Sequence, residues 1–250
     1  PPPPPPPPPP PHFFFPPHAA IAEPLWSRGL GDVYKRQMEH SRKSLETASD
    51  ICAAALDVGV TSIVRVPGHE GHHASRALDA GAMGIQFPHV RSAGEACALV
   101  SHCKFPPEGA RPMWGTYAQL DYAEMSISDM AATLNANTLV IVMIEEREGW
   151  RNLEEIAATE GVDVVFLGAN DMMAELGLHG QFDHPQLTEM VATVIDVCKK
   201  NGKYAGLGGV SDVALIREFI AQGLQWISSV SDLKLMLKAG REQAKALRSP

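Results

Sequence analysis

Four charged residues stand where a parallel α/β protein would gather its reactive groups. Arg65, Glu145 and Asp171 each lie at or just past the end of a predicted β-strand, and His40 follows a short segment before them. In a parallel α/β barrel, side chains at the C-terminal ends of the strands meet at one face. We therefore treat these four residues as the candidate site.

Glu145 follows the apolar run Leu139–Ile144, where an ionised carboxylate is costly unless a cation balances it. Two carboxylates from adjacent strand ends, completed by water and substrate oxygens, form the all-oxygen site that Mg²⁺ or Mn²⁺ prefers. Glu145 and Asp171 therefore predict a divalent metal site. The spacing alone leaves a structural alternative open, in which Glu145 caps a helix or pairs with Arg147. Asp171 would then cap a helix that begins at Met172.

The segment from His69 to His73 fits the HExxH motif, in which two histidines one helical turn apart bind zinc and the glutamate is the general base. Here the motif follows Pro67 and Gly68 and contains a glycine, which predicts a loop or the first turn of a helix. We therefore do not favour a metallopeptidase. A histidine of this segment lining the mouth of the site near Arg65 remains open.

From Met38 onward, β-branched runs alternate with amphipathic helical stretches such as 44–58 and 184–201. This pattern is typical of βα units around a parallel sheet. The predicted strands are 61–66, 84–87, 138–145, 162–168, 203–208 and 225–230. A stub before His40 brings the number to seven, whereas a closed (β/α)₈ barrel needs eight. We expect an α/β TIM barrel whose first strand is missing or is improvised from the preceding residues.

The first 37 residues differ from the rest in composition. Of the 21 prolines, 14 lie within residues 1–24, and Pro1–Pro11 is unbroken. Polyproline forms an extended helix without internal hydrogen bonds, and the residues that follow show no helical or strand period. We therefore divide the chain into a low-complexity tail, 1–37, and an α/β barrel domain, 38–250. Gly29–Gln37 also resembles a translated adapter sequence, which would make the tail foreign.

The charge balance limits the kind of partner. Residues 38–250 carry 18 basic and 27 acidic side chains, so the domain lacks the basic stripe that nucleic acids or anionic membranes require. Four cysteines without a CxxC pair indicate a reducing cytoplasm. We expect a soluble cytoplasmic protein that acts on a small molecule, with no nucleic-acid or membrane partner. His89, Lys104 and Arg111 are assigned to the rim or the solvated surface.

Five segments, in the right order, resemble the HpcH/HpaI aldolase and citrate lyase beta family. They are 38–41 (MEHS), 64–68 (VRVPG), 77–90, 103–112 and 143–177, and the likeness covers nearly all of 38–240. The resemblance implies a barrel of the phosphoenolpyruvate/pyruvate type. It also implies a class II aldolase that cleaves a 4-hydroxy-2-oxo acid into pyruvate and an aldehyde with Mg²⁺, Mn²⁺ or Co²⁺. Family members often form homo-oligomers, commonly hexamers, so a homo-oligomer whose contacts complete the site is expected.

The same resemblance implies a role for each candidate residue. Glu145 and Asp171 would be the metal ligands, Arg65 would face the pyruvate unit, and His40 would be the acid/base. These roles are chemically coherent, because a Lewis acid and a guanidinium both stabilise the enolate oxygen. His40 would take the proton from the C4 hydroxyl as the carbon–carbon bond breaks.

The Gly-x-x-Asp loop of the family holds the substrate carboxylate with backbone amides, which here points to Gly168 and Asn170. In this loop Ala169 replaces the usual proline. Met143 stands where many members have glutamine, two residues before the metal glutamate. These two departures bear on substrate choice or on the support of the metal ligands.

Gln37 occupies the position, three residues before His40, where family members commonly have an aspartate that orients the histidine. This departure keeps an inactive or assembly-only family member open as an alternative. A further alternative keeps the fold but acts on a CoA thioester, as in the citrate lyase branch. No basic cluster suited to the CoA phosphates is evident in the sequence.

Overall fold

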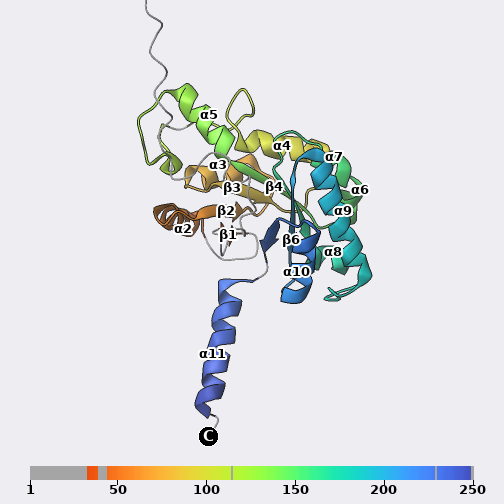
Figure 1. Ribbon diagram of the computed structural model, residues 1–250. Helices are drawn as coiled ribbons and strands as arrows, with labels where there is room; N and C mark the ends of the chain where they lie inside the picture. The colour runs from red at the N-terminus through yellow and green to blue at the C-terminus, as the bar shows by residue number, and fades with distance from the viewer. Residues whose placement is uncertain (1–32, 39–43, 114, 229, 249–250) are drawn as a thin grey trace, which may run out of the picture. The chain divides into compact units, whose positions relative to one another are not determined.

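The computed structural model describes residues 33–38, 44–113, 115–228 and 230–248 (Figure 1). The predicted acid/base His40 and residues 1–32 of the tail lie outside these ranges.

The described strands form one seven-stranded sheet in which the spatial order follows the chain order. They are β1 (Val33–Gln37), β2 (Thr61–Arg65), β3 (Gly84–Phe87), β4 (Leu139–Ile144), β5 (Val164–Gly168), β6 (Tyr204–Gly208) and β7 (Trp226–Ser228). The pairs β1/β2, β4/β5, β5/β6 and β6/β7 are parallel. The predicted α/β class and the six predicted strands are confirmed, with ends that differ by at most two residues.

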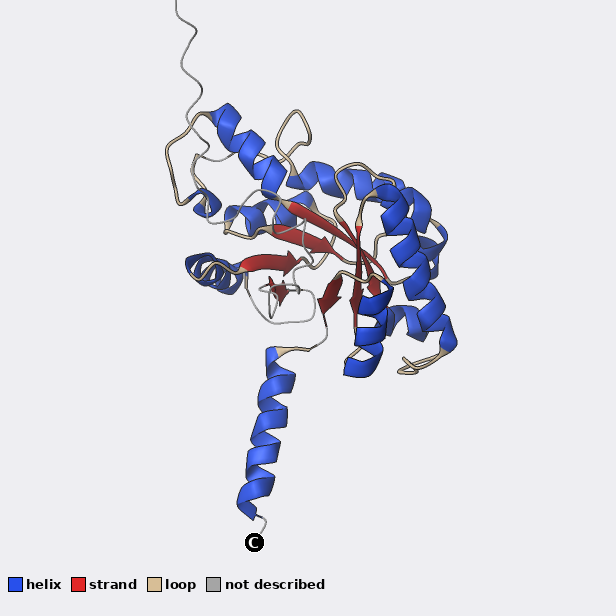
Figure 2. Ribbon diagram, in the orientation of Figure 1, coloured by secondary structure: helices blue, strands red, loops and turns tan. Residues whose placement is uncertain are grey.

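Helices alternate with the strands along the chain (Figure 2). They are α2 (Leu45–Asp57), α3 (Gly71–Asp79), α4 (Ala93–Cys103), the short 3-10 helix η1 (Ala118–Leu120), α5 (Ile127–Asn137), α6 (Arg147–Arg151), α7 (Leu153–Ala157), α8 (Ala169–Glu175), α9 (Pro185–Asn201), α10 (Val213–Gln222) and α11 (Asp232–Arg248).

The helix ends follow the local signals in the sequence. The Ser44 hydroxyl accepts a hydrogen bond from the Thr47 N–H at 3.3 Å and so caps the start of α2. Gly59 and Gly81, just after α2 and α3, adopt φ of +73° and +100°, which side chains disfavour. The polypeptide therefore turns sharply toward β2 and β3 at these glycines.

Val33–Gln37 belongs to the sheet, which corrects the expected boundary at Met38. The strand pairs with β2 from Val33 opposite Thr61 to Gln37 opposite Arg65. The Met38 N–H continues the pairing by donating to the Arg65 carbonyl at 2.9 Å. Parallel pairing uses backbone groups, which any non-proline segment supplies whatever its side-chain period. The first described strand is therefore formed by residues 33–37, which the sequence pattern assigned to the tail.

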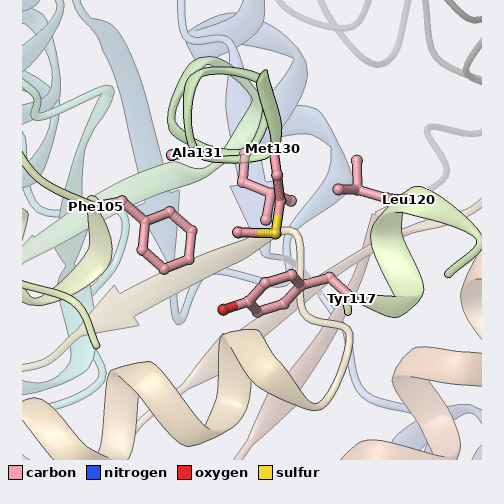
Figure 3. Close-up of a cluster of buried hydrophobic side chains, with 6 residues drawn as sticks. Phe105, Tyr117, Leu120, Met130 and Ala131 are labelled. Carbon is pink, nitrogen blue, oxygen red and sulfur yellow. The ribbon is translucent and has the colours of Figure 1, made fainter. Parts of the chain in front are cut away.

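By internal contacts the chain divides into two compact units. The first comprises the described residues up to Ile85 together with 101–139, and the second comprises 86–100 and 140–248. In the first unit, Met130 on α5 points toward the ring of Tyr117, with Phe105 beside it (Figure 3). In the second unit, α9 packs against β5 and β6. Both units therefore have apolar cores of their own.

Lys104 and Arg111 are buried in the first unit, so their assignment to the surface is wrong. The Lys104 ammonium donates to the Thr138 carbonyl at 2.8 Å. The Arg111 guanidinium pairs with Asp79 at 2.7 Å and lies 4.4 Å from the centre of the Phe105 ring. Buried cations are tolerated when such partners are fixed around them, and sequence alone does not reveal the partners.

Two truncations test the boundary of the sheet. Deleting residues 1–30 should leave the melting temperature unchanged within error, because their composition buries too little apolar area to offset ordering. Deleting residues 1–37 removes the pairing of β1 with β2 and should lower it by at least about 4 °C, the shift expected from about 2 kcal/mol in a domain of this size. Differential scanning calorimetry of both deletion variants measures the two melting temperatures. A large drop after the first deletion would show that residues 1–30 pack on the domain.

Candidate active site

Glu145 immediately follows β4 and is completely buried. The parallel register aligns Ile144 with Leu167, which places Gly168 beside Glu145 on the neighbouring strand. A Cβ atom added at Gly168 would lie 2.8 Å from both Cβ and Oε2 of Glu145, and 2.6 Å from Cε of Met143. The Glu145 side chain therefore lies directly over the Gly168 backbone, in space that only glycine leaves available.

His89, whose side chain is 42% exposed as expected for a residue of the rim, also contacts this buried carboxylate. Its backbone N–H donates to Oε1 of Glu145 at 3.0 Å. Its imidazole Nδ1 lies 3.4 Å from the same oxygen and 2.8 Å from Oε1 of Glu146. Sequence reasoning missed this residue because the loop after β3 carries no motif that separates a surface histidine from one that turns inward.

Glu146 is held from its other side by Arg91. The guanidinium of Arg91 donates through Nε at 2.6 Å and through Nη2 at 3.0 Å, one bond to each carboxylate oxygen. These hydrogen bonds are the main cause that lowers the pKa of Glu146, and the charges of Arg91 and His89 lower it further. The Arg91 carbonyl in turn accepts a bond from the Asn152 amide at 2.7 Å. The loop after β3 is thus fastened to the segment after β4.

Asp171 is exposed and lies in the first turn of α8. The helix begins at Ala169 rather than Met172, so the alternative in which Asp171 is a cap is wrong. A carboxylate in the first turn of a helix is favoured by the helix dipole. Arg147, the alternative partner of Glu145, uses its guanidinium on the Glu175 carbonyl at 2.6 Å.

Asn170 is also exposed and precedes Asp171 in the same turn. The side-chain nitrogen Nδ2 of Asn170 would lie 2.8 Å from a Cβ atom added at Gly209. Gly209 comes just after β6 and has φ of +98°. The second unit therefore brings Glu145 and Gly168 together and places Asn170 close to the end of β6. No described group of three or more His, Cys, Asp or Glu residues could hold a metal by itself. Water or substrate oxygens would have to complete any ligand set.

Arg65 ends β2 in the first unit, as predicted, and is only 5% exposed. Its guanidinium therefore belongs to a residue at the C-terminal end of a parallel strand, where α/β barrel enzymes place reactive groups. Gln37 lies opposite Arg65 in the parallel register of β1 and β2. It is the residue at which the family resemblance led us to expect an aspartate.

The HExxH motif does not form the arrangement of a zinc peptidase. Glu70 is the N-cap of α3, so His69 precedes the helix and does not share a helical face with His73. Glu70 lies 3.6 Å from Nε2 of His73. Burial and the neighbouring His72 lower the pKa of His73. Both histidines of a zincin pair must lie on one helix, so this geometry contradicts that alternative.

Gln86 in β3 is a second residue that sequence reasoning missed. It is completely buried, and its amide donates to the sulfur of Met143 at 3.3 Å. Its Oε1 atom has no hydrogen-bond partner among the described residues. The signal was present in the sequence, since Gln86 is the one polar residue in the four-residue strand GIQF. A buried carboxamide thus lies beside Met143.

A model of the HpcH/HpaI aldolase/citrate lyase family matches residues 33–239. The chain belongs to this family. It is 39% identical over 202 residues to 4-hydroxy-4-methyl-2-oxoglutarate aldolase of Chaetomium globosum, covering 80% of this chain and 72% of the relative. It is 34% identical over 236 residues to hydroxypyruvate/pyruvate aldolase of Paraburkholderia phytofirmans, covering 92% and 89%. The HpcH/HpaI match begins at β1, in agreement with the sheet.

The fold agrees with solved members of the HpcH/HpaI family. An HpcH/HpaI aldolase from Desulfitobacterium hafniense superposes with a TM-score of 0.81 at 26% identity, covering 89% of this chain and 86% of that one. The expected lyase class is confirmed by the family and by these aldolase relatives. Among the described helices, none is long and apolar enough to span a bilayer.

Substituting Gly168→Ala tests the contact between β5 and Glu145. The new methyl group would overlap Glu145, which must then move, because neither strand backbone can retreat. We expect a loss of about 1–3 kcal/mol in the free energy of unfolding, as for other overpacked core positions. Mn²⁺ affinity should fall as well. Gly115→Ala, at a glycine with open space around it and no left-handed backbone, is the control for metal affinity. Unchanged Mn²⁺ binding in Gly168→Ala would contradict this view of the site.

Proposed function

We propose that the chain catalyses the divalent-metal-dependent cleavage of a 4-hydroxy-2-oxo acid into pyruvate and an aldehyde or ketone, and the reverse condensation. The observation that carries the metal dependence is the completely buried carboxylate of Glu145 over Gly168. The substrate class is supported by the relative named for 4-hydroxy-4-methyl-2-oxoglutarate, which is itself a 4-hydroxy-2-oxo acid. The relative named for hydroxypyruvate and pyruvate supports the pyruvate half.

The donor set suits Mg²⁺, Mn²⁺ or Co²⁺. Oε1 of Glu145 accepts the His89 N–H, and Oε2 lies over the backbone of Gly168. Asp171, exposed in the turn that follows β5, offers a second carboxylate. Hard divalent ions bind such oxygens and keep water or substrate oxygens in their other positions. Glu145 and Asp171 would therefore hold the ion, which would act as a Lewis acid toward the keto oxygen of the pyruvate unit.

The protein groups have separate tasks in this proposal. Backbone N–H groups at Gly168 and Asn170, where α8 starts and its first amides lack helical partners, bind the substrate carboxylate. Arg65 donates to the oxygen on which enolate charge develops, and its burial keeps the guanidinium fixed before the reaction. His40 accepts the proton of the C4 hydroxyl as the bond between C3 and C4 breaks.

We also propose that the sheet belongs to a closed eight-stranded TIM barrel, that the protein is cytoplasmic, and that it forms a homo-oligomer, commonly a hexamer in this family. Free thiols at all four cysteines support a reducing compartment. Helix α11 supports the oligomer, because none of its described residues is buried. Large apolar side chains on it are exposed, including Leu233, Met236 and Leu237. Contiguous exposed apolar residues commonly mark a protein interface.

Pyruvate release from a 4-hydroxy-2-oxo acid tests the function. The activity should vanish with EDTA and return with Mg²⁺, Mn²⁺ or Co²⁺. Glu145→Ala and Asp171→Ala should abolish metal binding, and Arg65→Ala should lower kcat by about 10²–10³-fold, as for loss of one oxyanion donor. Glu154→Ala, which removes an exposed carboxylate on α7, is the matched control. An enzyme indifferent to the chelator would refute the metal-dependent mechanism.

The role of His40 needs a second comparison, because Gln37 replaces the acid expected to orient it. His40→Ala should cost little in this chain, whereas in Gln37→Asp it should cost about 10²–10⁴-fold in rate. Gln37→Asp should itself raise kcat. A chain that releases no pyruvate with any of the three metals, with or without Gln37→Asp, would favour the inactive alternative.

A further inference from the structure

We propose that His89 is a positioning residue whose imidazole fixes the orientation of the Glu145 carboxylate for metal binding. The inference rests on the proposed function, which makes Glu145 a metal ligand. It adds a residue that neither the family motifs nor the strand-end argument identified.

The first support is the convergence of two carboxylates on one imidazole nitrogen. Nδ1 of His89 lies 2.8 Å from Oε1 of Glu146 and 3.4 Å from Oε1 of Glu145. The His89 backbone N–H reaches the same oxygen of Glu145 at 3.0 Å. One residue thus approaches a single carboxylate oxygen with both its backbone and its side chain. Oε2, on the other branch of the carboxylate, lies against Gly168.

The second support is the backbone conformation of His89. Its φ of +54° lies in the left-handed region, which residues with a Cβ seldom adopt. Such strain persists only where the surrounding structure enforces it, and it is concentrated at functional sites. Glycine would satisfy this turn without strain, so the turn itself does not need a histidine. The left-handed conformation is what directs both the N–H and the ring of His89 toward Glu145.

The third support is that the contact is anchored from outside. Glu146 is fixed by two hydrogen bonds from Arg91, and the Arg91 carbonyl is bonded to Asn152 before α7. The Val90 N–H also donates to the Met143 carbonyl on β4 at 3.0 Å. Moving His89 away from Glu145 would therefore require breaking the hydrogen bonds of Arg91 and Val90. Outer hydrogen-bond partners of metal ligands restrict the ligand in the same manner.

The test measures Mn²⁺ affinity by calorimetry on the full chain, together with kcat, KM and the melting temperature. His89→Gly keeps the left-handed backbone and the N–H bond to Glu145 but removes the imidazole. We expect it to weaken Mn²⁺ binding by about 10–100-fold, the usual effect of losing an outer partner of a metal ligand. At saturating Mn²⁺, kcat should stay lowered while KM for the oxo acid changes little. The melting temperature should not fall, because the backbone strain is relieved.

A conservative variant and a strain control separate positioning from stability. Asn tolerates the left-handed region and carries an N–H donor, so His89→Asn should recover much of the lost affinity. Tyr122 also has positive φ, +55°, and is exposed. Tyr122→Gly relieves comparable strain far along the chain from Glu145 and should leave the Mn²⁺ affinity unchanged. The effects of His89→Gly and Glu146→Gln should be less than additive, since both remove the same contact.

Mn²⁺ affinity in His89→Gly within twofold of wild type would overturn the positioning role, as would an equal loss in Tyr122→Gly. Those results would leave the proposed function intact, provided that wild type binds Mn²⁺ and Glu145→Ala does not. Absence of Mn²⁺ binding in wild type would instead refute the proposed metal site and this inference together.

Discussion

The burial of the Glu145 carboxylate is the constraint on which the rest of the site depends. An ionised carboxylate removed from water loses several kcal/mol of solvation even after the protein relaxes, so its surroundings must return that energy. One oxygen receives the His89 N–H, and the other lies over a glycine. A hydrogen bond from a neutral amide offsets only part of the cost. In the proposed function, a divalent cation held by Glu145 would also balance its charge, which connects the burial of this carboxylate with metal dependence.

The neighbouring elements follow from this requirement. Glu145 can lie over β5 only because the parallel register places Gly168 beside it. Helix α9 packs on β5 and β6 and so supports β5. The loop after β3 adopts a strained backbone at His89 to reach the carboxylate, and the Arg91–Glu146 pair holds the loop there. A small set of backbone positions therefore fixes one acidic side chain.

Sequence reasoning succeeded where the signal is local or periodic. Buried parallel strands appear as runs of β-branched residues, and Glu145 was visible as a charge after such a run. It left β1 open between a missing strand and one formed by the tail, because strand pairing there depends on backbone groups opposite β2 rather than on a pattern within VYKRQ. It failed at Lys104 and Arg111, whose partners are 31 and 32 residues away in the chain. Polar residues of this kind resemble surface residues until the fold brings their partners to them.

The most direct measurement is anomalous diffraction from crystals of the full chain grown with Mn²⁺. The account predicts one strong Mn²⁺ peak in each chain, with carboxylate oxygens of Glu145 and Asp171 about 2.0–2.6 Å from the ion. Soaking with pyruvate should add substrate oxygens to the same ion and place Arg65 against the substrate. A peak held instead by the His69–His73 segment, or a Glu145 carboxylate turned away from the ion, would contradict the central claim.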